Sequence, residues 1–307
     1  MITADSRSLP RVGPRVAPRI RAACLTAICA AGLASSASAG AERATESATI
    51  ASALQPETVA PSADLPKAEE IFERYIEAIG GREKIEKIKN RRITGTYQGD
   101  PFEFRANVTV WWDAEGGFQQ RVAEPAGLKY ELFAVDDMTW SVIMDGEPTP
   151  MGGVQRQELL DTADFYGEAN YKNRYKEIRT AREAQAGETP IYIVNARTHA
   201  GRPHTLFFDQ ETGLLIGNRV PVSGPNNTMR DMTVRIQNYK DIGGVLYPTL
   251  FIQDFGGDTK PNRYEFTEIK VNVDDGHEFV VPDSIREVFE ASEEEAAAEE
   301  NESSSED

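Results

Sequence analysis

Hydrophobic residues change their spacing along the chain, and the change marks where helix gives way to sheet. The segment PKAEEIFERYIEAIGG, residues 66–81, places apolar side chains on one helical face and charged side chains on the other. Gly80 and Gly81 follow the last apolar residue, and glycine readily adopts the left-handed conformation that ends a helix. We therefore predict a helix in this segment and a second short helix at 82–88.

Beyond residue 100 the hydrophobic period becomes two. In FEFRANVTVWW, residues 102–112, apolar residues at even positions alternate with mostly polar ones, which predicts a long strand with one wet face. A half-exposed strand favours an antiparallel sheet, because parallel sheets are usually covered on both faces. Further runs of this kind are separated by Gly-Gly, Asp-Gly or Pro, which favour hairpins. The predicted strands are 92–98, 102–112, 117–123, 128–135, 139–144, 191–198, 204–208, 214–221, 228–239, 245–255 and 262–273. One helix is predicted between them, at 154–164.

The segment FFDQETGLLIG, residues 207–217, partly matches the motif in which phosphoryl-transferring pumps carry a phosphorylated Asp. That motif requires Lys directly after its Asp, and Gln210 occupies this position here. Asp209 and Gly213 instead stand between two apolar runs, where Asp accepts main-chain hydrogen bonds and Gly supplies a positive φ. We interpret the segment as a hairpin turn.

The two ends of the chain have compositions unlike the middle. Arginines recur up to residue 21, a short apolar run follows, and Ala37-Ser38-Ala39 has the small residues that a signal peptidase requires. Because the apolar run is too short to span a bilayer, we predict a secretory signal peptide at 1–39, cleaved after Ala39, and a periplasmic protein with no transmembrane segment in the mature chain.

The mature chain divides into three parts on composition. Residues 40–64 are rich in small and polar residues and predict a disordered linker, and residues 284–307 predict a disordered acidic tail. Residues 65–283 are long enough for one folded domain with a sizeable core.

Cysteine usage and charge exclude several classes of function. Cys24 and Cys29 both lie in the predicted signal peptide, so the mature chain has no disulfide, thiolate metal site or catalytic cysteine. Cleavage also removes five arginines and Asp5, which changes the formal charge from −17 to −21. Such a chain repels nucleic acid and anionic membrane surfaces, so neither is an expected partner.

The remaining candidates for chemistry are few. His199 and His204 flank a predicted turn with a spacing that fits no recognised metal motif, and we interpret them, with His277, as surface histidines. The segment VDDGHEF, residues 273–279, lacks the final Glu and the alternating acids of a calcium loop. Neither Gly-x-Ser-x-Gly nor His-Glu-x-x-His occurs. We predict no catalytic residue, no metal and no cofactor, and hence a protein that is not an enzyme.

The balance between sheet and helix leaves two possibilities open. About eleven strands present more apolar surface than one good helix and two short ones can be expected to cover. A curved sheet that is incompletely filled forms a pocket for an apolar ligand. The alternative is that helices and sheet simply pack together tightly.

Four segments, in this order, resemble the LolA/LolB-like family of bacterial envelope carriers, in particular its broad branch of secreted outer-membrane lipoprotein-sorting proteins. They are AEEIFERYIEAIGGREKIEKIKNRRITGTY, LFFDQETGLLIGNRV, IQNYKDIGGVLYPTLFIQDFGG and YEFTEIKVNVDDGHEFVVP. The resemblance implies a mainly β (α+β) fold, an incomplete antiparallel β-barrel of about eleven strands wrapped over a few short helices. It also implies a hydrophobic cavity that shelters the acyl chains of lipoproteins crossing the periplasm.

Together these observations predict a periplasmic binding or carrier protein for a lipid or for lipoprotein acyl chains. An envelope sensor or protein-interaction module with the same fold and no cargo is the alternative, and a lipid-ester hydrolase is the weakest one. The expected ligand-binding residues are Phe102, Phe104, Val108, Val110, Trp112, Leu132, Trp140, Val142, Met144 and Phe208.

Overall fold

The computed structural model describes residues 65–292, except residues 101, 103–104, 168, 224–228 and 258. The predicted signal peptide and linker lie outside the described residues, as does the chain from residue 293 onward. Helices α2 (Ala68–Ala78), α3 (Arg82–Glu86), α4 (Gly153–Ala163) and α5 (Tyr171–Arg174) accompany one large sheet. Within the described residues, no helix has the length and apolar character needed to cross a membrane.

The sheet contains 13 strands in the described residues, and every pairing is antiparallel. The strands are β1 (Asn90–Gln98), β2 (Ala106–Asp113), β3 (Phe118–Ala123), β4 (Lys129–Val135), β5 (Met138–Ile143), β6 (Thr149–Pro150), β7 (Tyr175–Ala186), β8 (Thr189–Thr198), β9 (Pro203–Asp209), β10 (Leu215–Ser223), β11 (Met229–Ile242), β12 (Val245–Asp254) and β13 (Asn262–Val271). Their spatial order is β6-β5-β4-β3-β2-β1-β13-β12-β11-β10-β9-β8-β7. The sheet therefore consists of two meanders that meet where β1 pairs with β13.

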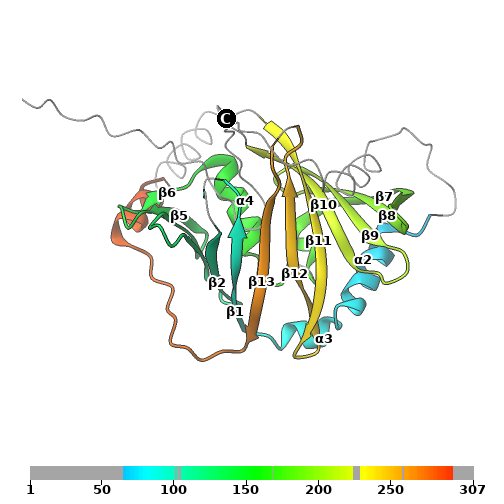
Figure 1. Ribbon diagram of the computed structural model, residues 1–307, viewed down its shortest axis with the longest axis horizontal. Coiled ribbons are helices and arrows are strands. Elements are labelled where there is room, and N and C mark those ends of the chain that lie inside the picture. Colours follow the sequence, from blue (N-terminus) through cyan, green and yellow to red (C-terminus); the bar gives the residue numbers. More distant parts are fainter. Residues whose placement is uncertain are drawn as a thin grey trace, which may run out of the picture.

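The sheet curls without closing (Figure 1). Strands β6 and β7 form its two edges, and no pairing joins them in the described part of the chain. Register shifts after Thr94 in β1 and after Leu215 in β10 are local irregularities of the kind that bend a strand and increase its twist. The fold is thus the incomplete antiparallel barrel with a few short helices that the sequence predicts.

The inner face of the sheet, defined here as the face that contacts α2, carries the main hydrophobic core. In β2 this face consists of Ala106, Val108, Val110 and Trp112, as the alternating pattern predicts. In α2 the buried residues are on the apolar stripe, and the Phe72 ring lies 5.3 Å from the Phe208 ring of β9. Helix and sheet therefore bury their apolar faces against each other.

The predicted strands differ from the structure in where one of them begins and in how many there are. The expected strand 102–112 begins only at Ala106, and Phe102 is buried outside it. Strands β6 and β7 were not predicted, so the number is thirteen rather than about eleven. Strand β7 was missed because YKEIRTAREAQA is rich in residues that favour helices, whereas its pairing with β8 makes it a strand. Charged residues on such an edge strand discourage pairing with other chains.

The packed structure continues beyond residue 283, where the sequence predicts the domain to end. Residues 283–292 form a helix, and the fully buried Ile285 packs on the outer face against Val135, Trp140 and Val281. The chain reaches this position from β13 by an extended segment that passes around the sheet (Figure 1).

The segment around Asp209 forms the predicted hairpin turn. The Asp209 carboxylate accepts hydrogen bonds from the main-chain N–H groups of Glu211 and Thr212, at 2.7 and 3.1 Å. The N–H of Gly213, at φ 75°, donates to the Asp209 carbonyl at 2.9 Å. The side chain of Asp209 is therefore engaged in closing the turn between β9 and β10.

Candidate functional site

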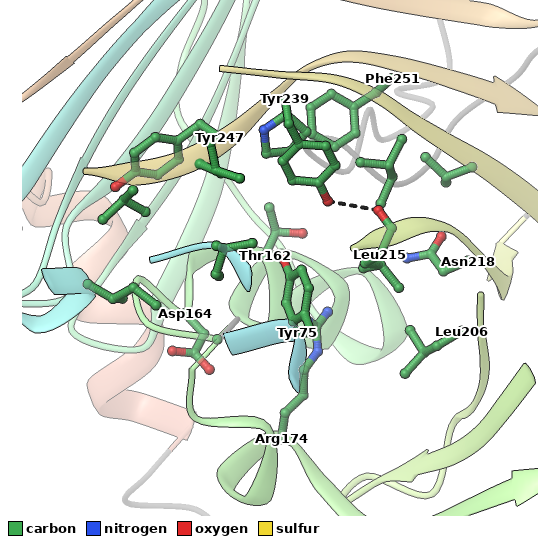
Figure 2. Close-up of a pocket in the computed structure, with 18 of the residues that line it drawn as sticks. Tyr75, Thr162, Asp164, Arg174, Leu206, Leu215, Asn218, Tyr239, Tyr247 and Phe251 are labelled. Carbon is green, nitrogen blue, oxygen red and sulfur yellow. Dashed lines mark hydrogen bonds between the residues drawn. The ribbon is translucent and has the colours of Figure 1, made fainter. Parts of the chain in front are cut away.

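A cavity of about 200 Å³ lies between α2 and the inner face of β9 to β13, with contributions from α3, α4, α5, β1, β2 and β7 (Figure 2). Its lining residues are mostly aromatic and aliphatic. They are Phe72, Tyr75, Ile79, Ile85, Arg91, Ile93, Trp112, Asp161, Thr162, Asp164, Gly167, Arg174, Tyr175, Leu206, Phe208, Leu215, Asn218, Val234, Ile236, Tyr239, Val245, Leu246, Tyr247, Pro248, Phe251 and Ile269. The cavity is thus an underfilled part of the same interface that forms the core.

Helix α2 forms one wall because its apolar side chains recur three and four residues apart. Phe72, Tyr75 and Ile79 all reach the cavity. The Phe72 ring also stacks on the Tyr171 ring at 4.3 Å, and the Tyr75 ring meets the Phe208 ring edge-on at 5.8 Å. These contacts fix the helix over β9 while leaving space on the side of β10 to β12.

The end of α2 is held by the hairpin between β11 and β12. The main-chain N–H of Leu246 donates a hydrogen bond of 2.8 Å to the Ile79 carbonyl. A Cβ atom at Gly80 would lie 2.4 Å from the carbonyl oxygen of Gly244, so only glycine fits there. The close approach brings Leu246 and Tyr247 beside α2 as part of the cavity wall.

Arg91 places a cation among aromatic rings at the cavity. Its guanidinium carbon lies 4.5 Å from the centre of the Trp112 ring, 4.2 Å from that of Phe165 and 5.2 Å from that of Tyr247. The guanidinium also donates a hydrogen bond to the Phe165 carbonyl oxygen. Since Arg91 is a buried residue on the inner face, these partners stabilise a charge that burial alone would disfavour.

Asn218 is a polar residue on the wall formed by β9, β10 and β11. Its cross-strand neighbours are Leu206 and Val234, which also line the cavity. The side-chain oxygen Oδ1 of Asn218 is buried and has no hydrogen-bond partner among the described residues. Near it, the Tyr239 hydroxyl donates a hydrogen bond of 2.7 Å to the Leu215 carbonyl, which satisfies that ring's polar end (Figure 2).

His204 occupies an inner-face position two residues before Leu206 in β9. Its Nδ1 lies 3.1 Å from the Tyr175 hydroxyl, and its Nε2 is buried without a partner among the described residues. Burial, followed by the charges of Arg174 and Arg202, lowers the pKa of His204 to about 3. The residue is only 5% exposed, so the interpretation of His204 as a surface histidine was wrong. His199 is exposed, as predicted.

Helix α4 is tied to the hairpin between β8 and β9 by ion pairs with little exposure. The Arg202 guanidinium lies 2.9 Å from the Glu158 carboxylate and 3.3 Å from that of Asp161. It also donates to the Pro221 carbonyl at 3.0 Å. This network positions Asp161 and the neighbouring Thr162 at the cavity.

The predicted ligand-binding residues are distributed over several environments. Trp112 and Phe208 line the cavity. Val108, Val110 and Leu132 are buried in the same inner core, and Phe102 lies there with its ring 5.7 Å from that of Tyr97.

The other four predicted residues lie elsewhere. Trp140 and Val142 belong to the cluster on the outer face that Ile285 completes. Met144 is 53% exposed at the turn after β5, and Phe104 lies outside the described residues. The structure thus brings two of the predicted residues together at the cavity.

Sequence reasoning missed the wall formed by α2 and by β10 to β13. Alternation in 228–239 and 245–255 identified strands but did not show that their inner residues face a void rather than a helix. The sequence contains one signal of the cavity. Asn218 is a polar residue within the mostly apolar strand LLIGNRV, at a position that faces inward.

Among the described residues, no group of three or more His, Cys, Asp or Glu side chains is arranged to hold a metal ion. The polar atoms at the cavity are instead arginine, aspartate, amide and hydroxyl groups beside rings and aliphatic chains. This arrangement can bind an apolar molecule and offer hydrogen bonds to a polar end of it.

Comparison with known proteins finds similar solved structures at low sequence identity. No family model matches the sequence, and no curated protein matches it. A LolA superfamily protein from Nitrosomonas europaea is similar in structure at 14% identity, covering 72% of this chain and 97% of that one, with a TM-score of 0.46. An outer membrane lipoprotein-sorting protein domain from Vibrio parahaemolyticus is similar at 10% identity, 68% and 96% coverage and a TM-score of 0.48. A DUF1329 family protein from Desulfovibrio piger matches at 10% identity, 67% and 93% coverage and the same TM-score.

Two of these structures are of a LolA superfamily protein and a lipoprotein-sorting protein domain, the family that the sequence resembles. At such identities and TM-scores, each likeness concerns the course of the chain and says nothing about a ligand or partner.

Proposed function

We propose that this protein is a periplasmic binding or carrier protein that holds a lipid, or an acyl chain of a lipoprotein, in the cavity between α2 and the inner face of the sheet. The observation that carries the proposal is the cavity of about 200 Å³ with a mostly apolar wall. Burying one acyl methylene contributes about 0.8 kcal/mol, so a single chain supplies a large gross affinity.

Two further features support this proposal. The arginine-rich start, short apolar run and Ala37-Ser38-Ala39 support export to the periplasm. Arg91 and Tyr239 are polar residues at the cavity, and each is held in place by a hydrogen bond to a main-chain carbonyl.

The first test is native mass spectrometry of residues 40–307 purified from the envelope of its own cell without detergent. We expect additional mass that extracts as lipid. The purified protein is then titrated with N-phenyl-1-naphthylamine, whose fluorescence rises in an apolar site. A clean mass and no fluorescence increase would show that the cavity takes no lipid, and the proposal would be abandoned.

A pair of variants locates the binding. Leu215→Trp fills the cavity from β10, and we expect it to weaken probe binding at least tenfold. Ile216→Trp is the matched control, because Ile216 packs with the outer-face cluster of Ile191, Ile193 and Phe207. Equal probe affinities in the two folded variants would exclude this cavity as the binding site.

A further inference from the structure

The wall of the cavity contains an acceptor that the described protein does not satisfy. Asn218 lies between Leu206 and Val234 on adjacent strands, and its Oδ1 is buried without a hydrogen-bond partner. In Figure 2 Asn218 stands beside Leu206 and Leu215 on one side of the cavity. Because buried polar atoms in folded proteins are nearly always paired, this oxygen is an acceptor that a donor on a ligand can satisfy.

The charges at the cavity do not favour an anionic ligand. The charged lining residues are Arg91, Arg174, Asp161 and Asp164, two of each sign. Arg91 is engaged with the Phe165 carbonyl and the surrounding rings, and Asp161 pairs with Arg202. The chain as a whole carries a formal charge of −17, which also repels anions.

The size of the cavity limits the ligand as well. Its volume of about 200 Å³ is below the roughly 300–1,000 Å³ of sites that enclose drug-sized ligands. One narrow chain with a small head fits this space better than a lipid with several chains.

We propose that the cavity binds a single-chain amphiphile with an uncharged head that carries a hydroxyl or amide donor, and that Asn218 Oδ1 accepts its hydrogen bond. Long-chain alcohols, monoacylglycerols and simple fatty amides belong to this chemical class. The inference rests on the proposed function, since it assigns the head group of the molecule whose chain the apolar wall holds. Asn218 is then a residue that determines specificity.

The test compares two ligands with the same twelve-carbon chain, monolauroylglycerol and laurate, each below its critical micelle concentration at neutral pH. Both are measured by displacement of N-phenyl-1-naphthylamine from the mature protein. We expect monolauroylglycerol to bind at least threefold more tightly than laurate. Tighter binding of laurate would overturn the inference.

The variant Asn218→Leu removes the amide and keeps a side chain of similar size. We expect its affinity for monolauroylglycerol to fall roughly three- to tenfold, the effect of losing one neutral hydrogen bond, while its affinity for the apolar probe is retained. Asn195→Leu is the control, because Asn195 is exposed on β8. Undiminished binding of monolauroylglycerol to Asn218→Leu would overturn the inference.

A second variant covers the case in which Asn218→Leu does not fold. Asn218→Asp keeps an acceptor oxygen at the same place and adds negative charge, so it should retain monolauroylglycerol and lose laurate. The reverse preference would contradict the assignment. Absence of probe binding by the wild type would defeat the proposed function and this inference together. Probe binding without a head-group preference would defeat this inference alone.

Discussion

His204 shows how a single polar residue can be placed inside a β-sheet protein and remain neutral. Its inner-face position next to Leu206 removes it from water, and the Tyr175 hydroxyl satisfies one ring nitrogen. The charges of Arg174 and Arg202 nearby also disfavour a positive charge on the imidazole, so the pKa of His204 falls from 6.5 to about 3. The neutral imidazole is therefore the form that the fold accommodates.

This lowered pKa predicts a dependence of stability on pH. Protonation favours the unfolded state, in which histidine has its ordinary pKa, so the contribution of His204 is complete above pH 6.5 and is lost as the pH falls toward about 3. The slope is at most about 1.4 kcal/mol per pH unit for one proton. Urea unfolding at several pH values should show a shallower acid loss for His204→Gln than for the wild type. His199→Gln, at an exposed position, should follow the wild type, and three coincident curves would contradict the assignment.

The sequence contained part of this information. In HTLFF the residues His204, Leu206 and Phe208 alternate, and Leu206 and Phe208 are apolar, so period-two reasoning places His204 on the inner face as well. The pattern could not show which residues surround His204, since Arg174 and Tyr175 lie at the junction of α5 and β7, and the sequence predicted neither element. Asn218 is similar: its inner position can be read from the strand, but its lack of a partner cannot.

At the scale of elements, α2 and the hairpin between β11 and β12 act together. The sequence predicted this helix from its apolar stripe and its end from the terminal glycines, and the structure confirms the helix and its end. The sequence pattern could not show which element the end of the helix contacts, because that contact joins residues far apart in the chain. Gly80 and Gly244 approach so closely that neither helix nor hairpin can move without changing the wall of the cavity.

A substitution at Gly80 should therefore affect both stability and binding. Gly80→Ala places a Cβ 2.4 Å from the Gly244 carbonyl oxygen at a φ of 128°, and we expect a loss of at least about 2 kcal/mol in the free energy of unfolding, together with weaker probe binding. Gly116→Ala provides the control, because Gly116 also has a positive φ but has nothing within 4 Å of the added atom. The comparison is made by denaturant unfolding. A loss at Gly80 no larger than that at Gly116 would show that the close contact is unimportant.

At the scale of the whole molecule, the chain after β13 supplies part of the packing of the opposite meander. Ile285 and Val281 cover Trp140 of β5 on the outer face, although the acidic composition after residue 283 suggested that the fold had ended. One apolar residue every few positions is sufficient to attach a short helix when a matching apolar patch exists. The overall composition of residues 284–307 does not reveal single apolar residues such as Ile285. The predicted end of the domain at residue 283 is therefore too early.

Removing the contact that Ile285 makes with the outer face should lower the stability of the protein. Ile285→Ala deletes a fully buried side chain, and we expect the protein to lose about 2–4 kcal/mol of unfolding free energy. Val288→Ala in the same helix should cost much less, since Val288 is 49% exposed. Thermal unfolding of the two variants beside the wild type decides the matter. Similar melting temperatures for all three would mean that the helix is not part of the cooperative unit.

The junction between the two meanders has a consequence for how the molecule is made. Apart from β1 with β13, every strand pairs with its neighbour in the chain, so most of the sheet can assemble from hairpins with short loops. The junction joins residues far apart, and at one end the Asn90 side chain exchanges hydrogen bonds with the main chain of Val273, 183 residues away. Closing so long a loop carries the largest entropic cost in the sheet. Until β13 pairs with it, β1 is therefore an open edge of the first meander, and at this stage of folding the chain is most exposed to pairing with the wrong partner.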